Sequence, residues 1–224
     1  MPPRSRARPA PTSKKDRAAD PASVLRLLKD AYPDARIELD ATNPLELLMA
    51  IVLSAQTTDQ RVNEVTPELF TRFRTAADYV AADPAELERI LGPVGFFRQK
   101  TKAVQQVATA LVERHDGEVP DNVDELVAIP WVGRKSANLL LVGAFGASAL
   151  AVDTHVRRVA QRLGWSDATD VDKVEAEVAA LFEPADLGPL TLRTVLHGRR
   201  VCVARKPKCD RCALADLCPS RGTG

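Results

Sequence analysis

The sequence predicts an all-α fold. From Pro21 onward, apolar residues recur at the period of an α-helix, and no run alternates between apolar and polar residues over the length of a strand. Apolar residues make up 45% of the 224 residues and charged residues 27%, enough for a core in one large domain or two small ones. The longest apolar run, 47–53, is too short to span a bilayer and predicts a buried helix.

The expected helices follow one another along the chain. Apolar stripes place them near 24–28, 45–55, 62–73, 75–82, 84–91, 104–111, 123–129, 134–145, 154–163, 170–182 and 187–199. Asp121 or Asn122 is expected to cap the helix at 123–129, and Asp153 the helix at 154–163. Residues 1–20 are rich in Pro, Arg, Ala and Ser with little to bury, which predicts a disordered basic tail.

Two segments repeat a pattern, Ile-Leu-Gly-Pro-Val-Gly at 90–95 and Ile-Pro-Trp-Val-Gly at 129–133. Each follows a short helix and precedes a basic one, so each is interpreted as a hairpin whose glycine turns with positive φ. The start of the next helix presents free amides and the positive end of a dipole, which favours an anion. An ordinary turn between helices is the alternative.

Two residues stand out as candidates for catalysis. Lys135 falls in the first turn of the helix at 134–145, where the helix dipole and Arg134 both disfavour further positive charge. A lysine nucleophile requires the neutral amine, although a surface lysine that touches phosphate is the competing interpretation. Asp153 ends the apolar stretch 149–152, where a carboxylate can act in catalysis, cap a helix, or do both.

All four cysteines lie near the end of the chain, spaced C-x6-C-x2-C-x5-C: Cys202, Cys209, Cys212 and Cys218. Four thiolates so close together can hold a zinc ion or an iron–sulfur cluster, and the spacing alone does not choose. Two disulfides are the alternative, but they need an oxidising compartment, and no apolar signal core follows Met1.

Positive charge is concentrated in two places. Residues 1–17 hold six basic groups against one acid, which leaves 25 basic and 29 acidic residues in the rest of the chain. Residues 193–211 hold seven basic groups against Asp210 alone, in a stretch that overlaps the cysteines. Such a local excess favours a polyanion partner, with a solvated charged face as the alternative.

Four segments, in order, resemble the endonuclease III family of the helix–hairpin–helix DNA glycosylase superfamily. They are Leu-Ser-Ala-Gln-Thr-Thr-Asp at 53–59, Ile-Pro-Trp-Val-Gly-Arg-Lys-Ser-Ala-Asn at 129–138, Ala-Val-Asp-Thr-His-Val-Arg-Arg-Val at 151–159, and His-Gly-Arg at 197–199 running into the cysteines. The resemblance extends over about residues 21–219.

The resemblance implies two helical domains with a DNA groove between them. One is a six-helix domain at 37–147 that carries the hairpin, and the other combines 21–36 with 148–224 and holds a 4Fe–4S cluster on the four cysteines. It implies removal of oxidised pyrimidines from double-stranded DNA and cleavage at the abasic site, with Lys135 as nucleophile and Asp153 as supporting carboxylate. The implied DNA contacts are Gln56, Phe96, Pro130, Trp131, Val132, Gly133, Arg134, His155, Arg205, Lys206 and Lys208.

The chain departs from the family pattern at two of these contacts. Phe96 stands where the family usually has a leucine wedge, and phenylalanine can also intercalate between base steps. Trp131 replaces the first glycine of the family hairpin L-P-G-V-G, where a bulky residue adds strain if φ is positive. Reduced activity, or a preference for distorted or single-stranded DNA, is therefore expected.

Two alternatives stay open from the sequence. One is a monofunctional glycosylase for mismatched or alkylated bases, which would need Asp153 but not Lys135. The other is a weakly active damage-binding protein that keeps the fold and the cluster. With no signal peptide or membrane segment apparent, a monomer in the cytoplasm, at the bacterial nucleoid, is expected.

Overall fold

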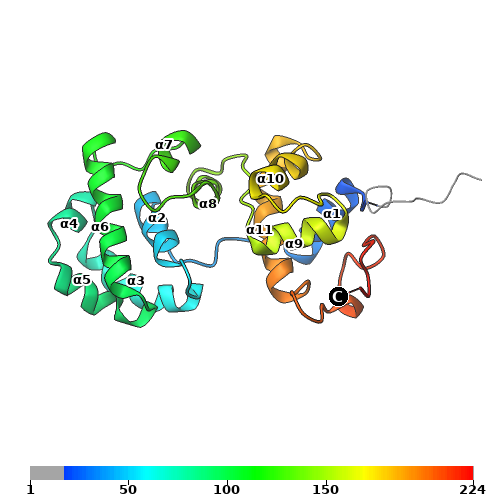
Figure 1. The fold of residues 1–224 in the computed structure, drawn as a ribbon, viewed down its shortest axis with the longest axis horizontal. Helices are drawn as coiled ribbons and strands as arrows, with labels where there is room; N and C mark the ends of the chain where they lie inside the picture. Colours follow the sequence, from blue (N-terminus) through cyan, green and yellow to red (C-terminus); the bar gives the residue numbers. More distant parts are fainter. Residues whose placement is uncertain (1–17, 224) are drawn as a thin grey trace, which may run out of the picture. The chain divides into compact units, whose positions relative to one another are not determined.

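The computed structural model describes residues 18–223, which form two compact units. The hairpin unit comprises 35–151 and 184–192, and the cysteine unit comprises 18–34, 152–183 and 193–223. Over the described residues there are eleven α-helices, two short 3-10 helices and no strand, which confirms the all-α prediction (Figure 1). Residues 1–17, most of the expected basic tail, lie outside the described residues.

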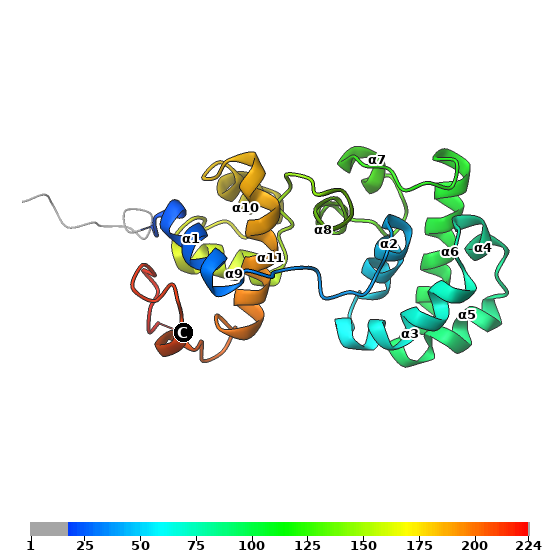
Figure 2. The same ribbon diagram turned by 180° about the vertical axis from the view of Figure 1, so that it is seen from behind.

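The hairpin unit is built around one buried helix. Every residue of α2 from Leu47 to Leu53 is buried, as its apolar run predicts, and α2 lies between α6 and α8 (Figures 1 and 2). Helices α4 and α5 pack on α6, and α7 packs on α8. The bounds are α2 Pro44–Leu53, α3 Asp59–Arg72, α4 Ala76–Ala81, α5 Pro84–Leu91, η2 Gly92–Val94, α6 Phe97–Arg114, α7 Val123–Val127 and α8 Arg134–Phe145.

Short polar side chains set where most of these helices begin. Such a side chain accepts a hydrogen bond from a first-turn amide that has no partner inside the helix. Asn122 does this for α7, from the amide of Glu125 at 2.9 Å, which decides between the two expected caps. The same arrangement starts α2, α3, α4 and α5 at Asn43, Thr58, Thr75 and Asp83.

The cysteine unit joins the first helix to the C-terminal part of the chain (Figure 2). It contains α1 Pro21–Ala31, α9 Thr154–Leu163, α10 Val171–Ala179, the second half of α11 Pro184–Arg200, and η3 Cys209–Arg211. The first half of α11, residues 184–192, belongs to the hairpin unit, although the sequence analysis assigned everything after 148 to the cluster domain.

The ordered structure starts before the expected boundary at Pro21. Ala19 is buried, its amide donates to the carbonyl of Leu163 at 2.9 Å, and its carbonyl accepts from Trp165 Nε1 at 2.8 Å. Asp20 caps α1 by accepting from the amide of Ser23. These contacts fix residues 19 and 20, which the sequence placed in the disordered tail. None of the helices from residue 18 to 223 has the length and apolar character needed to cross a membrane.

Candidate nucleic-acid interface and cysteine site

The start of α8 carries the lysine singled out from the sequence. Gly133 is its N-cap, and along the described α8 no side chain caps the first turn and no acidic residue lies in it. Lys135 is half-buried and Arg134 is exposed. The first amides of α8 and these two cations therefore favour an anion at this end of the helix.

The hairpin before α8 turns at a different residue from the one expected. Gly133 has a φ of −86°, so the predicted positive φ at this glycine is wrong. The left-handed residue is Trp131, with a φ of 68°. The amide of Val132 donates to the carbonyl of Ile129 at 3.2 Å, and both side chains are buried, whereas Pro130 and Trp131 are exposed.

The indole of Trp131 is held in place. Its Nε1 donates to Oε1 of Gln106, on α6, at 2.7 Å, and 46% of the residue remains exposed. The sequence predicted strain at position 131 on the condition that its φ is positive. That condition is met, because the bulky Trp131 adopts a positive φ.

Left-handed backbone marks most of the loops that the sequence assigned to DNA. Positive φ occurs at five described residues other than glycine. One is Asp116, after α6, and the other four are exposed residues predicted to contact DNA: Gln56, Phe96, Trp131 and Lys206. Each costs roughly 1–2 kcal/mol relative to ordinary backbone. Strain of this kind concentrates at functional sites.

The first hairpin presents Phe96 to solvent. Gly95 has the predicted positive φ, 69°, and Phe96 follows with 48° and is 63% exposed. Lys100, which is only 5% exposed, reaches back from α6 and donates from Nζ to the carbonyl of Val94 at 2.9 Å. Burial lowers the pKa of the Lys100 ammonium below its ordinary 10.5. This bond fixes the backbone directly before Gly95 and Phe96.

Asp153 is the expected N-cap of α9, and it caps with one oxygen only. Oδ1 accepts from the amide of His155 at 2.8 Å and from the amide of Val156 at 2.7 Å. Capping therefore leaves Oδ2 for other chemistry, so the structural and catalytic interpretations are compatible. Just before it, in the hairpin unit, the carbonyl of Leu150 accepts from Asn138 Nδ2 at 3.0 Å.

Two arginines on one face of α9 hold the loop that contains the first cysteine. Arg158 donates to the carbonyls of Gly198 and Cys202 at 2.8 and 2.9 Å, and it also contacts His155 Nδ1 at 3.0 Å. Arg162 donates to the carbonyls of Val203 and Ala204, at 2.8 and 3.1 Å, and to the sulfur of Cys202 at 3.2 Å. The loop after α11 is therefore tied to the helix that Asp153 caps.

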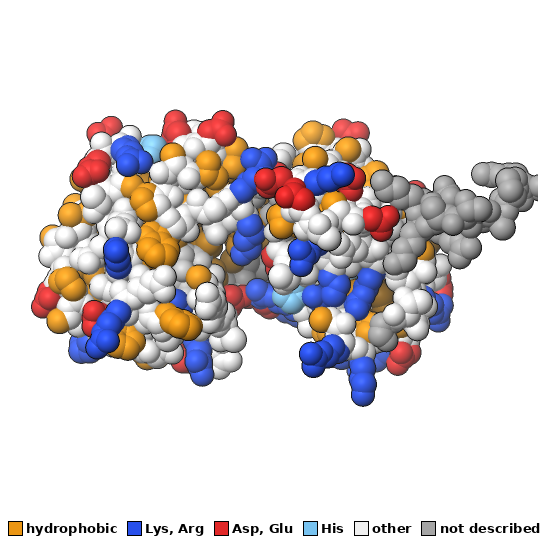
Figure 3. Space-filling model, viewed as in Figure 1, with side chains coloured by type: hydrophobic (Ala, Val, Ile, Leu, Met, Phe, Trp, Pro, Cys, Tyr) orange, Lys and Arg blue, Asp and Glu red, His pale blue; other side chains and the backbone are white. Residues whose placement is uncertain are grey.

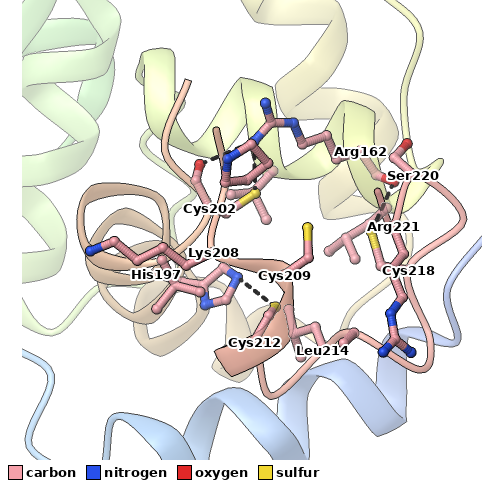
Figure 4. A pocket seen from close by; sticks show the side chains of 15 residues that line it. Arg162, His197, Cys202, Lys208, Cys209, Cys212, Leu214, Cys218, Ser220 and Arg221 are labelled. Carbon is pink, nitrogen blue, oxygen red and sulfur yellow. Dashed lines mark hydrogen bonds between the residues drawn. The ribbon is translucent and has the colours of Figure 1, made fainter. Parts of the chain in front are cut away.

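The four cysteines form no disulfide and line one hollow (Figure 4). Among the described residues, no three Cys, His, Asp or Glu side chains have the geometry of a single-ion site. Zinc would draw four sulfurs to about 2.3 Å from one point, whereas here the sulfurs lie around the hollow and do not converge on one point (Figure 4). Four cysteine sulfurs around one hollow are the donor set of an iron–sulfur cluster.

His197 is placed to donate a hydrogen bond to a ligating sulfur. His197 is buried, which lowers its pKa to about 4 and keeps the ring neutral near pH 7. Its Nδ1 lies 3.2 Å from the hydroxyl of Tyr32, and its Nε2 lies 3.6 Å from the sulfur of Cys212. Once Cys212 ligates as a thiolate, Nε2 has to be the donor, which leaves Nδ1 to accept from Tyr32. Burial raises the pKa of the Cys212 and Cys218 thiols, so ligation must displace their protons.

Residues 205–208 form a basic loop that lies between two of these cysteines in the sequence. Arg205 and Lys206 are exposed, while Lys208 donates from Nζ to the carbonyl of Arg200 at 3.0 Å, which directs its ammonium to the backbone. Lys and Arg side chains gather on the cysteine unit where this loop runs (Figure 3). Of the three cations, Arg205 and Lys206 are the better placed to meet a phosphate.

Sequence reasoning missed several residues of this site. Nothing in the chain marks Gln106 as the partner of Trp131, since it is one polar residue among many on α6. Lys100 could have been suspected from its place near the buried stripe of α6. Arg158 and Arg162 gave the clearest signal, because two arginines four residues apart share one helix face.

Comparison with known proteins agrees with this geometry. Residues 49–184 match the model of the HhH-GPD superfamily of base excision DNA repair proteins, and residues 202–218 match the iron–sulfur binding domain of endonuclease III. The chain belongs to the endonuclease III family. Membership makes it an enzyme that acts on DNA in base excision repair, with the helix–hairpin–helix fold of DNA glycosylases.

The family relatives are similar over nearly their whole length. Endonuclease III of Synechocystis sp. is 46% identical over 93% of this chain and 94% of its own, and that of Bacillus subtilis is 42% identical over 84% and 87%. Among solved structures, a non-covalent endonuclease III–DNA complex is 40% identical with a TM-score of 0.85, covering 90% of this chain and 95% of the other. A trapped covalent endonuclease III–DNA intermediate is 41% identical with a TM-score of 0.84, covering 89% and 94%.

Proposed function

We propose that this chain removes oxidised pyrimidines from double-stranded DNA as a glycosylase and then cleaves the strand at the abasic site by β-elimination. One observation carries the proposal. Lys135 lies half-buried in the first turn of α8, beside Arg134 and without a carboxylate in that turn of the described helix. Its amine lies at the end of the helix that favours an anion, where a bound phosphate would bring the attached sugar within reach of a lysine nucleophile.

The chemistry assigns one step to each residue. A base inside the stack is out of reach, so the damaged nucleotide must first turn out of the duplex. Nζ of Lys135 then bonds to the sugar C1′ as the base leaves, which gives a Schiff base from which the 3′ phosphate is eliminated. Asp153 stabilises positive charge on the sugar and assists proton transfer through Oδ2, the oxygen that capping does not use.

The remaining predicted contacts fill supporting roles in this proposal. The start of α8 and the hairpin 129–133 bind phosphates, together with Arg205, Lys206, Lys208 and His155. Gln56 occupies the space left by the flipped base, and Phe96 inserts between base steps on the opposite strand. Exposure and left-handed backbone at Gln56 and Phe96 support this assignment, because both side chains project from constrained loops. Action as a monomer in the cytoplasm, at the nucleoid, is part of the same proposal.

We assign the four thiols to a 4Fe–4S cluster. When bound, the cluster cross-links the four sulfurs and is capable of one-electron chemistry. Excision and β-elimination involve no net oxidation or reduction, so the part that these residues play in the reaction is structural. Cys202 and Cys209 bracket the basic loop, and ligation at both ends would hold Arg205 and Lys206 in a fixed orientation toward phosphate.

Borohydride trapping tests the proposal. An oligonucleotide with a single thymine glycol or abasic site should form a covalent adduct with the wild-type protein, and Lys135→Ala should form none. Lys102→Ala, which removes an exposed lysine from α6 of the same unit, is the matched control and should keep the adduct. A Lys135→Ala variant that still cleaves the strand by β-elimination would contradict the assignment.

The same assay separates the two alternatives. A monofunctional glycosylase would release a base without any trapped adduct, in wild type and Lys135→Ala alike. A damage-binding protein would bind the lesion and release no base. The conformation of Trp131 favours the damage-binding alternative, because a bulky left-handed residue occupies the hairpin.

A further inference from the structure

Three observations describe how Trp131 is held in the hairpin. Its backbone is left-handed with a φ of 68°, its indole nitrogen is bonded to Gln106 on another helix, and nearly half of the residue is open to solvent. The residue is therefore presented at the surface in a fixed orientation.

The exposed half of the Trp131 side chain contributes nothing to stability. Left-handed backbone in a bulky residue is unfavourable by an amount similar to what one hydrogen bond contributes. The Trp131–Gln106 bond lies at the surface, where water competes with it, and the side chain buries only about half of its area. Glycine would adopt the same φ without strain. The exposed aromatic surface is thus available to bind a ligand.

The anchoring restricts what the indole can bind. Nε1 is the only polar donor of the ring, and it is already directed at Gln106. What remains for a ligand is the aromatic surface, which suits a flat ring. Three residues further on, Arg134 opens α8 and its uncapped amides, so a phosphate held there brings the attached sugar and base close to Trp131.

We propose that Trp131 is a stacking platform for an unpaired nucleobase, held in orientation by Gln106. A base inside a matched duplex has both faces covered by its neighbours, so the platform would favour mismatched, abasic or single-stranded DNA over matched duplex. This inference rests on the proposed function, since it requires that the start of α8 binds DNA phosphates.

Intrinsic fluorescence gives a direct test, because the chain has two tryptophans. Trp165 is buried in the cysteine unit and bonded to Ala19, so Trp165→Phe leaves Trp131 as the single emitter. Lys135→Ala in the same protein prevents strand cleavage. Single-stranded and abasic-site oligonucleotides should quench Trp131 at saturation, and a matched duplex should quench it much less.

If Trp165→Phe fails to fold, the emission of Trp131 can be obtained by difference. The fluorescence of Lys135→Ala/Trp131→Phe is subtracted from that of Lys135→Ala. Binding is followed separately by the anisotropy of a labelled oligonucleotide. DNA that binds without quenching Trp131 overturns the stacking inference and leaves the proposed function intact. A protein that binds no DNA in the anisotropy assay overturns both.

Substitutions test the anchor as well as the ring. Trp131→Gly should lower the ratio of single-strand to matched-duplex affinity by roughly 5- to 150-fold, the range that one base–aromatic stack provides. It should also raise excision from matched duplex carrying one lesion. Gln106→Leu should lower the ratio in the same direction, whereas Gln106→Glu, which keeps an acceptor for Nε1, should retain it. An unchanged ratio in Trp131→Gly would reduce the tryptophan to a tolerated hairpin residue.

Discussion

The two oxygens of Asp153 allow its capping role to be separated from its catalytic role by a pair of substitutions. Oδ1 accepts both amide hydrogen bonds at the start of α9. Asparagine keeps an oxygen that can cap in the same way but cannot carry negative charge. Alanine removes both the cap and the charge. The two variants should therefore differ in stability and agree in activity.

The expected magnitudes follow from the cap. Replacing an N-cap aspartate by alanine costs about 1 kcal/mol, within a range of roughly 0.5–2, whereas asparagine caps about as well. For a protein of this length that corresponds to a fall in Tm of about 2–4 °C for Asp153→Ala and close to none for Asp153→Asn. Both should lose base excision by about 100-fold or more, the lower end of what a positioned acid or base contributes.

Thermal unfolding and single-turnover excision measure the two effects on the same preparations. Asp170 is the matched control, because it caps α10 in the same unit by accepting from the amide of Lys173 at 2.9 Å. Asp170→Asn and Asp170→Ala should show the same difference in stability with no loss of excision. Wild-type excision by Asp153→Asn would refute the catalytic role, and equal stability of Asp153→Asn and Asp153→Ala would refute the assignment of the cap.

Further predictions concern packing, charge and the cluster. Gly198→Ala should lower Tm and weaken excision, because a Cβ there would lie 2.7 Å from His155 Cβ, next to Asp153. Gly92→Ala, which meets no atom within 4 Å, should do neither. Burial lowers the pKa of Lys100, so as the pH rises the native state loses this proton before the unfolded state does. The free energy of unfolding therefore rises with pH up to the unfolded pKa of 10.5. Lys100→Met should remove that rise in denaturant titrations. Anaerobically purified protein should be brown with about four irons per chain, and a colourless protein with stoichiometric zinc would contradict this.

Most of the fold could be predicted from local signals. Each expected helix is present, because an apolar stripe and a capping residue act within a few residues of one another. The division of α11 between the two units could not be predicted, because the helix runs without interruption from Pro184 to Arg200. The hairpin turn was wrongly placed at Gly133 because glycine is the usual left-handed residue, and only the fold shows that Trp131 takes that conformation.

The candidate site also has residues that could be predicted from the sequence and contacts that could not. Lys135, Asp153 and the cysteines were visible as residue types at informative positions in the sequence. The hydrogen bonds that orient the site join residues far apart in the chain, such as Trp131 with Gln106 and Arg162 with the loop after Cys202. Local pattern carries no information about such pairs, because either partner would look equally ordinary in another place.

The four residues with positive φ assigned to DNA lower the stability of this protein and provide its specificity. At Gln56, Phe96, Trp131 and Lys206, glycine would relieve backbone strain of roughly 1–2 kcal/mol each. Each of those replacements would also delete a side chain that we assign to DNA. A selection for heat resistance alone would therefore favour glycine at these loops and drift toward a sturdier protein that no longer discriminates among its substrates. Conversely, some substitutions should raise stability and lower substrate preference at the same time. The positions of those substitutions would identify the loops that contact DNA, without any structure of a complex.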